Sequence, residues 1–396
     1  MLTRRWGVRA LALLLALVVT VLASGCGGSK VKKTVASPRP SPSASPSGTP
    51  ADGGDAPLLS PDLLVLSRES LPAKVVRGVG ALPGVAATTV FSMGQFYVEE
   101  QSVTYATVDP QAFRRFTPVG TARTDDVWGR VTDGELAIRP DLAKQIVDAD
   151  GDLTLGNGDD AESVHVGALA ELTPPFHQHY VDAVLDQSWA KRLDLPAGNA
   201  MLVDTGQTSP QSLQKKLIGL AGRGVSVQIL GPNLDTSVAL SAVLTGGSVA
   251  RAVGSFTYTV NADGTVNPDP AWVRDYIRTE QVPILGAVRC NKAMLPQLRA
   301  ALTDIARLGL AAKIHKNQYG GCYVPRFIAR DPSKGLSFHT FGTAIDLNVP
   351  ENQRGTAGLI DRQVVQIFNR WGFNWGGTWR YTDPMHFELA RIVKVR

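Results

Sequence analysis

Residues 337–349 read SFHTFGTAIDLNV and place a histidine, His339, seven positions before an aspartate, Asp346. The chain has only six histidines in 396 residues, and another, His386, follows in the stretch DPMHFE. Imidazole nitrogen and carboxylate oxygen are good zinc ligands, and a catalytic zinc site uses three protein ligands and leaves a fourth position for water. The sequence therefore predicts that His339, Asp346 and His386 bind Zn²⁺.

Two small residues separate the first two candidate ligands. Gly342 and Ala344 keep bulk away from this turn of the chain, so the ligands on either side can face one centre. The run AIDLNV is typical of a buried strand, which would hold Asp346 firmly.

A hydrolytic site also needs a base and a group that stabilises developing negative charge. Asp383 lies three residues before His386, a spacing that can hold its carboxylate beside a metal-activated water, so we predict it as the general base. Arg326, in GGCYVPRFI, is the candidate for polarising the scissile carbonyl; the alternative is a surface arginine. Glu388 could hydrogen-bond with a ligand histidine or be an ordinary carboxylate at a strand edge.

These motifs, S-x-H-x-x-G-x-A-x-D and a late acidic residue before x-x-H, resemble those of the zinc D-Ala-D-Ala carboxypeptidases. Relatives in that family include VanY-type enzymes and L-alanyl-D-glutamate endopeptidases. The resemblance covers about residues 280–390 and implies a zinc peptidase that acts on peptidoglycan stem peptides. Carried over by position, it gives the roles of zinc ligand, general base and carbonyl-polarising group to the residues predicted above, and it adds Ser337 to the first motif.

One position departs from the commonest family pattern. Many of these carboxypeptidases have glutamate at the base position, whereas this chain has the shorter Asp383. Aspartate at this position also occurs among the endopeptidase-like relatives, so the bond that is cleaved stays open. We assign Ser337, Trp375 and Trp379 to substrate binding, although the two tryptophans could instead be core aromatics beside the metal site.

The first 25 residues have the pattern of a bacterial export signal. A basic start precedes an apolar run over residues 10–23, which is shorter than the about 20 residues of a membrane-spanning helix. The run ends in Ala-Ser-Gly-Cys, which resembles a lipobox and predicts lipidation of Cys26; an ordinary secretory signal is the alternative. We expect an exported protein, anchored by lipid on the extracytoplasmic face of the cell membrane.

Residues 26–57 are rich in proline, serine and glycine, with almost no large apolar side chains. Such a segment cannot bury enough surface to offset chain entropy, so we predict a disordered tether. The net charge of +5 suits an anionic envelope surface, and no recognition motif points to nucleic acid.

The rest of the chain predicts an α+β fold in two domains. Residues 58–260 mix alternating strands with helices and form an accessory domain that weakly resembles the extracytoplasmic core domain of FtsX-type and macrolide-exporter-type permeases. Residues 265–396 form the peptidase domain, with helices over KAMLPQLRAALTDIARLG and DRQVVQIFNRWG and strands over AAKIH and HFELARI. Cys290 and Cys322 both fall in this domain, and in an oxidising compartment they predict one disulfide rather than two free thiols.

Two other stretches look like metal sites but fit poorly. DADGDLTLGNGDD lacks the glycine and glutamate positions of a calcium-binding EF-hand loop, so we interpret it as a hairpin turn. His177 and His179, in FHQHY, could share one side of a strand, but no third ligand lies nearby in sequence.

Two rival functions remain at this point. One is a zinc-fold module that binds peptidoglycan or an envelope partner protein without cleaving it, for which Asp383 would be dispensable. The other is an envelope-assembly role, in which residues 58–260 contact a protein partner.

Overall fold

The computed structural model describes residues 56–99 and 101–395. The predicted signal peptide, Cys26 and nearly all of the predicted tether (residues 26–57) lie outside these residues. In the described part of the chain, no helix has the length and apolar character needed to cross a membrane. Below, residues 56–239 are called the N-terminal region and residues 240–395 the C-terminal region.

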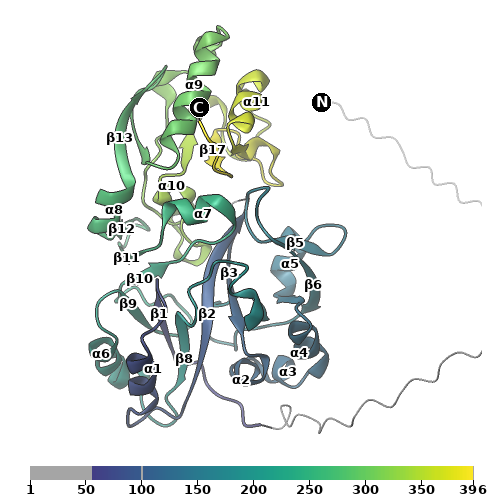
Figure 1. Ribbon diagram of the computed structural model, residues 1–396, viewed down its shortest axis with the longest axis vertical. Helices are drawn as coiled ribbons and strands as arrows, with labels where there is room; N and C mark the ends of the chain where they lie inside the picture. Colours follow the sequence, from purple (N-terminus) through teal and green to yellow (C-terminus); the bar gives the residue numbers. More distant parts are fainter. Residues whose placement is uncertain (1–55, 100, 396) are drawn as a thin grey trace, which may run out of the picture. The chain divides into compact units, whose positions relative to one another are not determined.

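The N-terminal region is built on a nine-stranded mixed sheet with the order β5-β6-β4-β7-β3-β2-β8-β1-β9 (Figure 1). Strands β3 and β7 pair in parallel, as do β4 and β6, and the other neighbours are antiparallel. The strands are β1 (Leu63–Ser67), β2 (Ala87–Val98), β3 (Gln101–Val108), β4 (Leu136–Ile138), β5 (Asp152–Thr154), β6 (Ser163–Leu169), β7 (Ala183–Asp186), β8 (Ala200–Asp204) and β9 (Val225–Ile229).

Helices cover this sheet on both faces. All five residues of β1 are buried, with Leu64 and Leu66 in one core and Leu63 and Val65 in another, because successive side chains of a strand point to opposite faces. Figure 1 shows α1 beside α6, the pair that supplies the second of these cores. The helices are α1 (Ala73–Gly80), α2 (Pro110–Phe113), α3 (Val119–Ala122), α4 (Asp125–Thr132), α5 (Pro140–Ile146) and α6 (Pro210–Ala221).

The C-terminal region holds three small antiparallel sheets and the longest helix of the described chain. The sheets have the orders β10-β11-β12, β13-β14 and β15-β17-β16. The elements are β10 (Leu240–Ala242), α7 (Gly247–Val253), β11 (Phe256–Val260), β12 (Val266–Pro268), α8 (Pro270–Tyr276), β13 (Ile277–Val282), β14 (Gly286–Asn291), α9 (Leu295–Arg307), α10 (Phe338–Phe341), β15 (Ala344–Asp346), α11 (Arg362–Arg370), β16 (Phe373–Trp375) and β17 (His386–Leu389).

The mixed α+β class predicted from the sequence is confirmed, as are its main helices. In α9 the buried face includes Leu298, Leu302 and Ile305, which lie at helical spacing within the stretch predicted as a helix. Helix α11 packs beside α9, and Figure 1 shows the two side by side. Helix α11 also packs against β16 of the sheet that carries two of the candidate metal ligands.

One hydrophobic core spans the C-terminal region and extends past the predicted domain boundary. It contains Leu240, Phe256 and Tyr258 together with residues as late as Leu389, and it takes in Tyr97 from β2 of the large sheet. Sheet β10-β11-β12 also joins residues on both sides of positions 260–265. The division into residues 58–260 and 265–396 stays a prediction.

Two local predictions are wrong. AAKIH is no strand: Ala311–Lys313 form a 3-10 turn that follows directly after α9, where Gly309 lies at a φ of 71°. FHQHY is no strand either: residues 174–177 form a turn that includes two prolines, with the His177 N–H donating to the Pro174 carbonyl. By contrast, the Asp- and Gly-rich stretch at 148–160 does contain a hairpin turn, as predicted: its residues after β5 lead into β6.

Candidate metal centre

Helix α10 turns His339 into the interior. Ser337 caps this helix, its hydroxyl accepting a hydrogen bond from the His339 N–H at 3.3 Å. Gly342 ends it in the left-handed region, at a φ of 68°. A Cβ at Gly342 would lie 2.8 Å from the Asn291 nitrogen, so the close approach of β14 requires glycine here. His339 is left only 2% exposed.

The other two ligands come from neighbouring strands. Asp346 ends β15 and His386 begins β17, and the antiparallel register pairs these two residues directly. Directly opposed residues place their Cβ atoms about 5 Å apart on the same face of the sheet. Three short elements thus bring together residues that are far apart in sequence.

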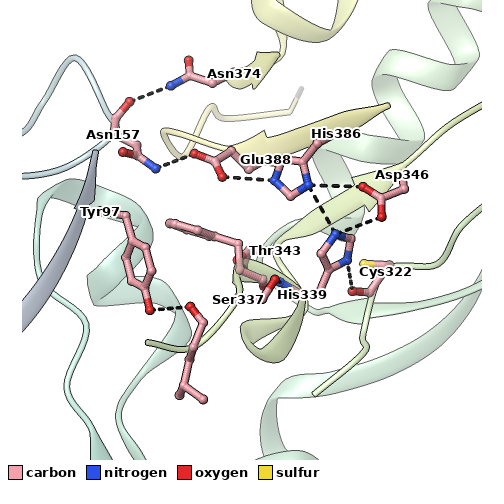
Figure 2. Close-up of polar contacts among 12 residues, drawn as sticks. Tyr97, Asn157, Cys322, Ser337, His339, Thr343, Asp346, Asn374, His386 and Glu388 are labelled. Carbon is pink, nitrogen blue, oxygen red and sulfur yellow. Dashed lines mark hydrogen bonds and ion pairs between the residues drawn. The ribbon is translucent and has the colours of Figure 1, made fainter. Parts of the chain in front are cut away.

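The three candidate ligands converge (Figure 2). Asp346 Oδ2 lies 3.2 Å from His339 Nε2, Asp346 Oδ1 lies 3.2 Å from His386 Nδ1, and the two nitrogens are 3.3 Å apart. A tetrahedral zinc ion with metal–ligand distances of about 2.0–2.1 Å separates its ligand atoms by about 3.3–3.4 Å. The donor set therefore fits a tetrahedral ion in both chemistry and spacing.

The outer nitrogen of each imidazole is held by an acceptor. His339 Nδ1 lies 3.0 Å from the carbonyl oxygen of Cys322, and His386 Nε2 lies 3.2 Å from Glu388 Oε2. Donation from these nitrogens leaves His339 Nε2 and His386 Nδ1 with lone pairs directed at the centre. Hydrogen-bonded outer nitrogens are a general feature of histidines that bind metals. Of the two roles open for Glu388, the structure supports the hydrogen-bonding one.

The electrostatics of the cluster favour positive charge at its centre. Burial opposes ionisation of Asp346, but the imidazoles of His339 and His386 outweigh it and hold the pKa of this carboxyl well below its usual range. Burial would also lower the pKa of His386, yet its hydrogen bonds with Asp346 and Glu388 raise that pKa well above the usual value. A cation at this point, whether proton or metal, is stabilised by the surrounding carboxylates.

Asp383 lies beside the cluster, with its backbone carbonyl accepting from the His386 N–H at 3.0 Å. Its side chain is buried, and its Oδ1 has no hydrogen-bond partner among the described residues. Burial raises the pKa of Asp383; the imidazole of His386 opposes this shift, and the Asp346 carboxylate adds to it. An unpartnered buried carboxylate oxygen is unusual and is often explained by a role in binding or catalysis.

Arg326 is tied to α10 through its backbone. Its N–H donates to Thr340 Oγ1 at 2.9 Å, and its carbonyl accepts from the same hydroxyl at 2.7 Å. Its guanidinium donates to the carbonyl of Phe327 at 3.3 Å. A role for Arg326 in polarising a substrate carbonyl stays a prediction.

The predicted substrate-binding residues have different surroundings. Ser337 is the cap of α10. Trp375 is buried in the core, stacks on Phe387 and donates from its indole nitrogen to Pro384 at 2.7 Å. Trp379 lies against the His386 ring, with centroids 5.3 Å apart. Both tryptophans also line a cavity of about 520 Å³ between the two regions, so core and substrate-binding roles both stay open.

Cys290 and Cys322 form the predicted disulfide, which is confirmed, with their Cα atoms 5.4 Å apart. The bond links β14 to the segment whose Cys322 carbonyl accepts from His339.

His177 and His179 are not part of any cluster of three or more ligands among residues 56–99 and 101–395, where the only such cluster is the one described above.

Sequence reasoning missed two residues near the centre. Arg354 lies close enough for its charge to act on Asp383, and its guanidinium lies 5.2 Å from the centroid of the Tyr381 ring. Asn157, from the turn after β5, donates to Glu388 (Figure 2). No sequence signal marked Asn157, because it lies 231 positions before its partner.

Comparison with protein families places these residues in a known context. Residues 330–389 match a family model described as D-alanyl-D-alanine carboxypeptidase. The matched stretch includes the three candidate ligands and Asp383, but it begins after Arg326. The match supports a peptidase domain at the C-terminal end of the chain. None of the curated proteins compared matches the chain.

Among solved structures, a domain assigned to a permease of Porphyromonas gingivalis is similar to this chain at 15% identity. The similarity covers 42% of this chain and 85% of that domain, with a TM-score of 0.21. A TM-score this low does not establish a shared fold.

Proposed function

We propose that this chain is a zinc-dependent peptidase that hydrolyses an amide bond in peptidoglycan stem peptides. The observation that carries the proposal is the convergence of His339, Asp346 and His386 at tetrahedral ligand spacing, inside the stretch that matches the carboxypeptidase family. We further propose that the protein is exported and anchored through lipidated Cys26, since its substrate lies outside the cell membrane.

Zinc held by these three residues would supply Lewis-acid chemistry that activates water and polarises the scissile carbonyl. The chain's own residues handle the protons. Asp383 accepts the proton of the attacking water and returns it to the leaving amine, a role that suits a carboxyl group with a raised pKa. Arg326 is proposed to stabilise the negative charge that develops on the carbonyl oxygen.

The test uses the purified full chain as wild type and as Asp383→Asn, which removes the base but keeps its size. We expect both proteins to bind about one zinc ion. Wild type should release a fragment from muropeptides, detected by mass spectrometry, and the variant should be slower by about 10²–10⁴-fold. Loss of one D-Ala would identify a carboxypeptidase, and a split after L-Ala an endopeptidase.

Three results would contradict parts of this proposal. If neither protein binds zinc, the metal centre is wrong. If both bind zinc and neither cleaves any stem peptide, the chain is a binding module. If Asp383→Asn cleaves as fast as wild type, the base is another group.

A further inference from the structure

The turn of the β5–β6 hairpin, in the N-terminal region, reaches the sheet that carries His386. Gly156 has a φ of 154°, and a Cβ at Gly158 would lie 2.3 Å from the Ala390 carbonyl oxygen. The absence of a side chain at Gly158 thus permits direct contact with the end of β17. The Arg391 guanidinium pairs with Asp159 of the same turn.

Asn157 sits between these glycines, and both its backbone and its side chain contact the C-terminal region. Its backbone carbonyl accepts from the Asn374 side-chain amide at 2.9 Å. Its own side-chain amide donates to Glu388 Oε1 (Figure 2). Strand register places Asn374 directly opposite Glu388, so both contacts fall at one point of sheet β15-β17-β16.

Glu388 uses its other oxygen for the metal centre. Oε2 lies 3.2 Å from His386 Nε2, while Oε1 faces Asn157. The residue is only 1% exposed, so water cannot easily replace either contact. A buried carboxylate oxygen without a hydrogen-bond partner is unfavourable, so the carboxylate tends to rotate toward another partner.

We propose that Asn157 is a positioning residue for the metal centre: its amide fixes the Glu388 carboxylate, which in turn fixes the ring of His386. This inference rests on the metal site of the proposed function. It extends that site to a turn in the N-terminal region, which belongs to a different sheet from every candidate ligand. The N-terminal region then helps to position a candidate ligand of the metal centre.

The experiment measures metal binding, without substrate, in the full chain. Zinc affinity is determined by chelator competition for wild type, Asn157→Ala, Glu388→Gln and the double variant. Carboxylate partners of ligand histidines typically contribute 10–100-fold to metal affinity. We expect Asn157→Ala, one step further out, to weaken zinc binding by about tenfold, and to shift the visible spectrum of the Co²⁺-loaded protein.

The double variant distinguishes positioning from a general effect on folding. If Asn157 acts through Glu388, Asn157→Ala should add little in the Glu388→Gln background. Asp159→Ala is the matched control, because it removes another side-chain contact between the same turn and the C-terminal region, the ion pair with Arg391, without touching Glu388. It should keep wild-type zinc affinity and an unchanged Co²⁺ spectrum.

The outcomes separate this inference from the proposed function. If wild type binds zinc and Asn157→Ala binds it with the same affinity, the inference is overturned and the proposed function is not. An equal loss in Asn157→Ala and Asp159→Ala, or an undiminished effect in the Glu388→Gln background, also overturns the inference alone. A wild-type protein that binds no zinc overturns the metal centre and the inference together.

Discussion

Two buried aspartates show how neighbours decide the charge of a carboxyl group. Asp346 faces two imidazoles, which outweigh its burial and hold its pKa low. Asp182 is also buried, with Arg139 3.1 Å away and a hydrogen bond from the Thr104 N–H, but burial dominates and raises its pKa to about 6. The Asp346 carboxylate is therefore ionised and suited to bind a cation, whereas the protonation of Asp182 should make the stability of the protein depend on pH.

Asp182 should make stability depend on pH. Because the pKa of Asp182 is about 6 in the folded state and its usual value is 3.8, the folded state holds more protons between these pH values. The contribution of Asp182 to the free energy of unfolding is therefore largest below about pH 4 and is lost as pH rises through 6. The total loss is about 3 kcal/mol at most. Denaturant unfolding at several pH values should show this decline, and Asp182→Asn should remove it. Parallel pH curves for the two proteins would contradict the prediction.

At the scale of elements, the metal centre depends on how α10, β15 and β17 are held. The loop after α9 has little regular structure, yet its Cys322 carbonyl accepts from His339. The disulfide from Cys290 fixes this loop to β14, and the Asn291 side chain, next on that strand, donates to the Phe341 carbonyl at 3.0 Å. The disulfide and this hydrogen bond thus position the helix that carries one ligand.

Removing the disulfide should weaken both stability and metal binding. The sequence separation is 32 residues, for which chain entropy predicts a loss of about 3–4 kcal/mol. The double variant Cys290→Ala and Cys322→Ala should unfold at lower denaturant concentration and bind zinc less tightly, since the acceptor for His339 is less firmly placed. Wild type in reductant should behave in the same way. Unchanged zinc affinity in the double variant would show that the loop holds its position without the bond.

Sequence patterns predicted the elements well where the signal is local. The helical spacing in α9 and α11 and the alternation in β2 and β3 gave the correct types, because each pattern lies within one element. AAKIH was wrongly predicted as a strand. Gly309 ends the preceding helix, residues 311–313 continue as a 3-10 turn, and the segment pairs with no strand of the described chain. Two of the candidate ligands could be predicted for a similar reason, because His339 and Asp346 share one short motif.

What sequence could not provide is contact between distant segments. Asn157 and Glu388 meet only because the turn of the β5–β6 hairpin reaches sheet β15-β17-β16. Arg380 is another case. Its backbone N–H donates to the Glu99 carboxylate at the β2–β3 turn. Its guanidinium donates to the Lys144 carbonyl, near the end of α5, at 3.0 Å. These contacts hold the segment between Trp379 and Asp383, and no local sequence pattern predicts them.

The whole-molecule question is whether the C-terminal region can fold alone. Its core includes seven buried residues that precede position 265, and all but Tyr97 lie in β10, α7 and β11. Tyr97 itself donates to the Leu336 carbonyl at 2.7 Å and packs edge-on against Phe338 of α10. A fragment cut at the predicted boundary would lose this packing next to the helix that carries His339. The seven residues are Tyr97, Leu240, Ala242, Val249, Val253, Phe256 and Tyr258.

We therefore predict that residues 265–396 alone do not unfold cooperatively, because removal of even one large buried side chain costs about 3–5 kcal/mol. Residues 236–396 restore six of the seven and should show a thermal transition, below that of the full chain because Tyr97 and the Asn157 turn are still missing. Calorimetry of the three proteins, each with and without zinc, tests this order. If residues 265–396 melt cooperatively at the temperature of the full chain, the early residues are not needed for the core. The peptidase region would then be independent of the sheet that precedes it.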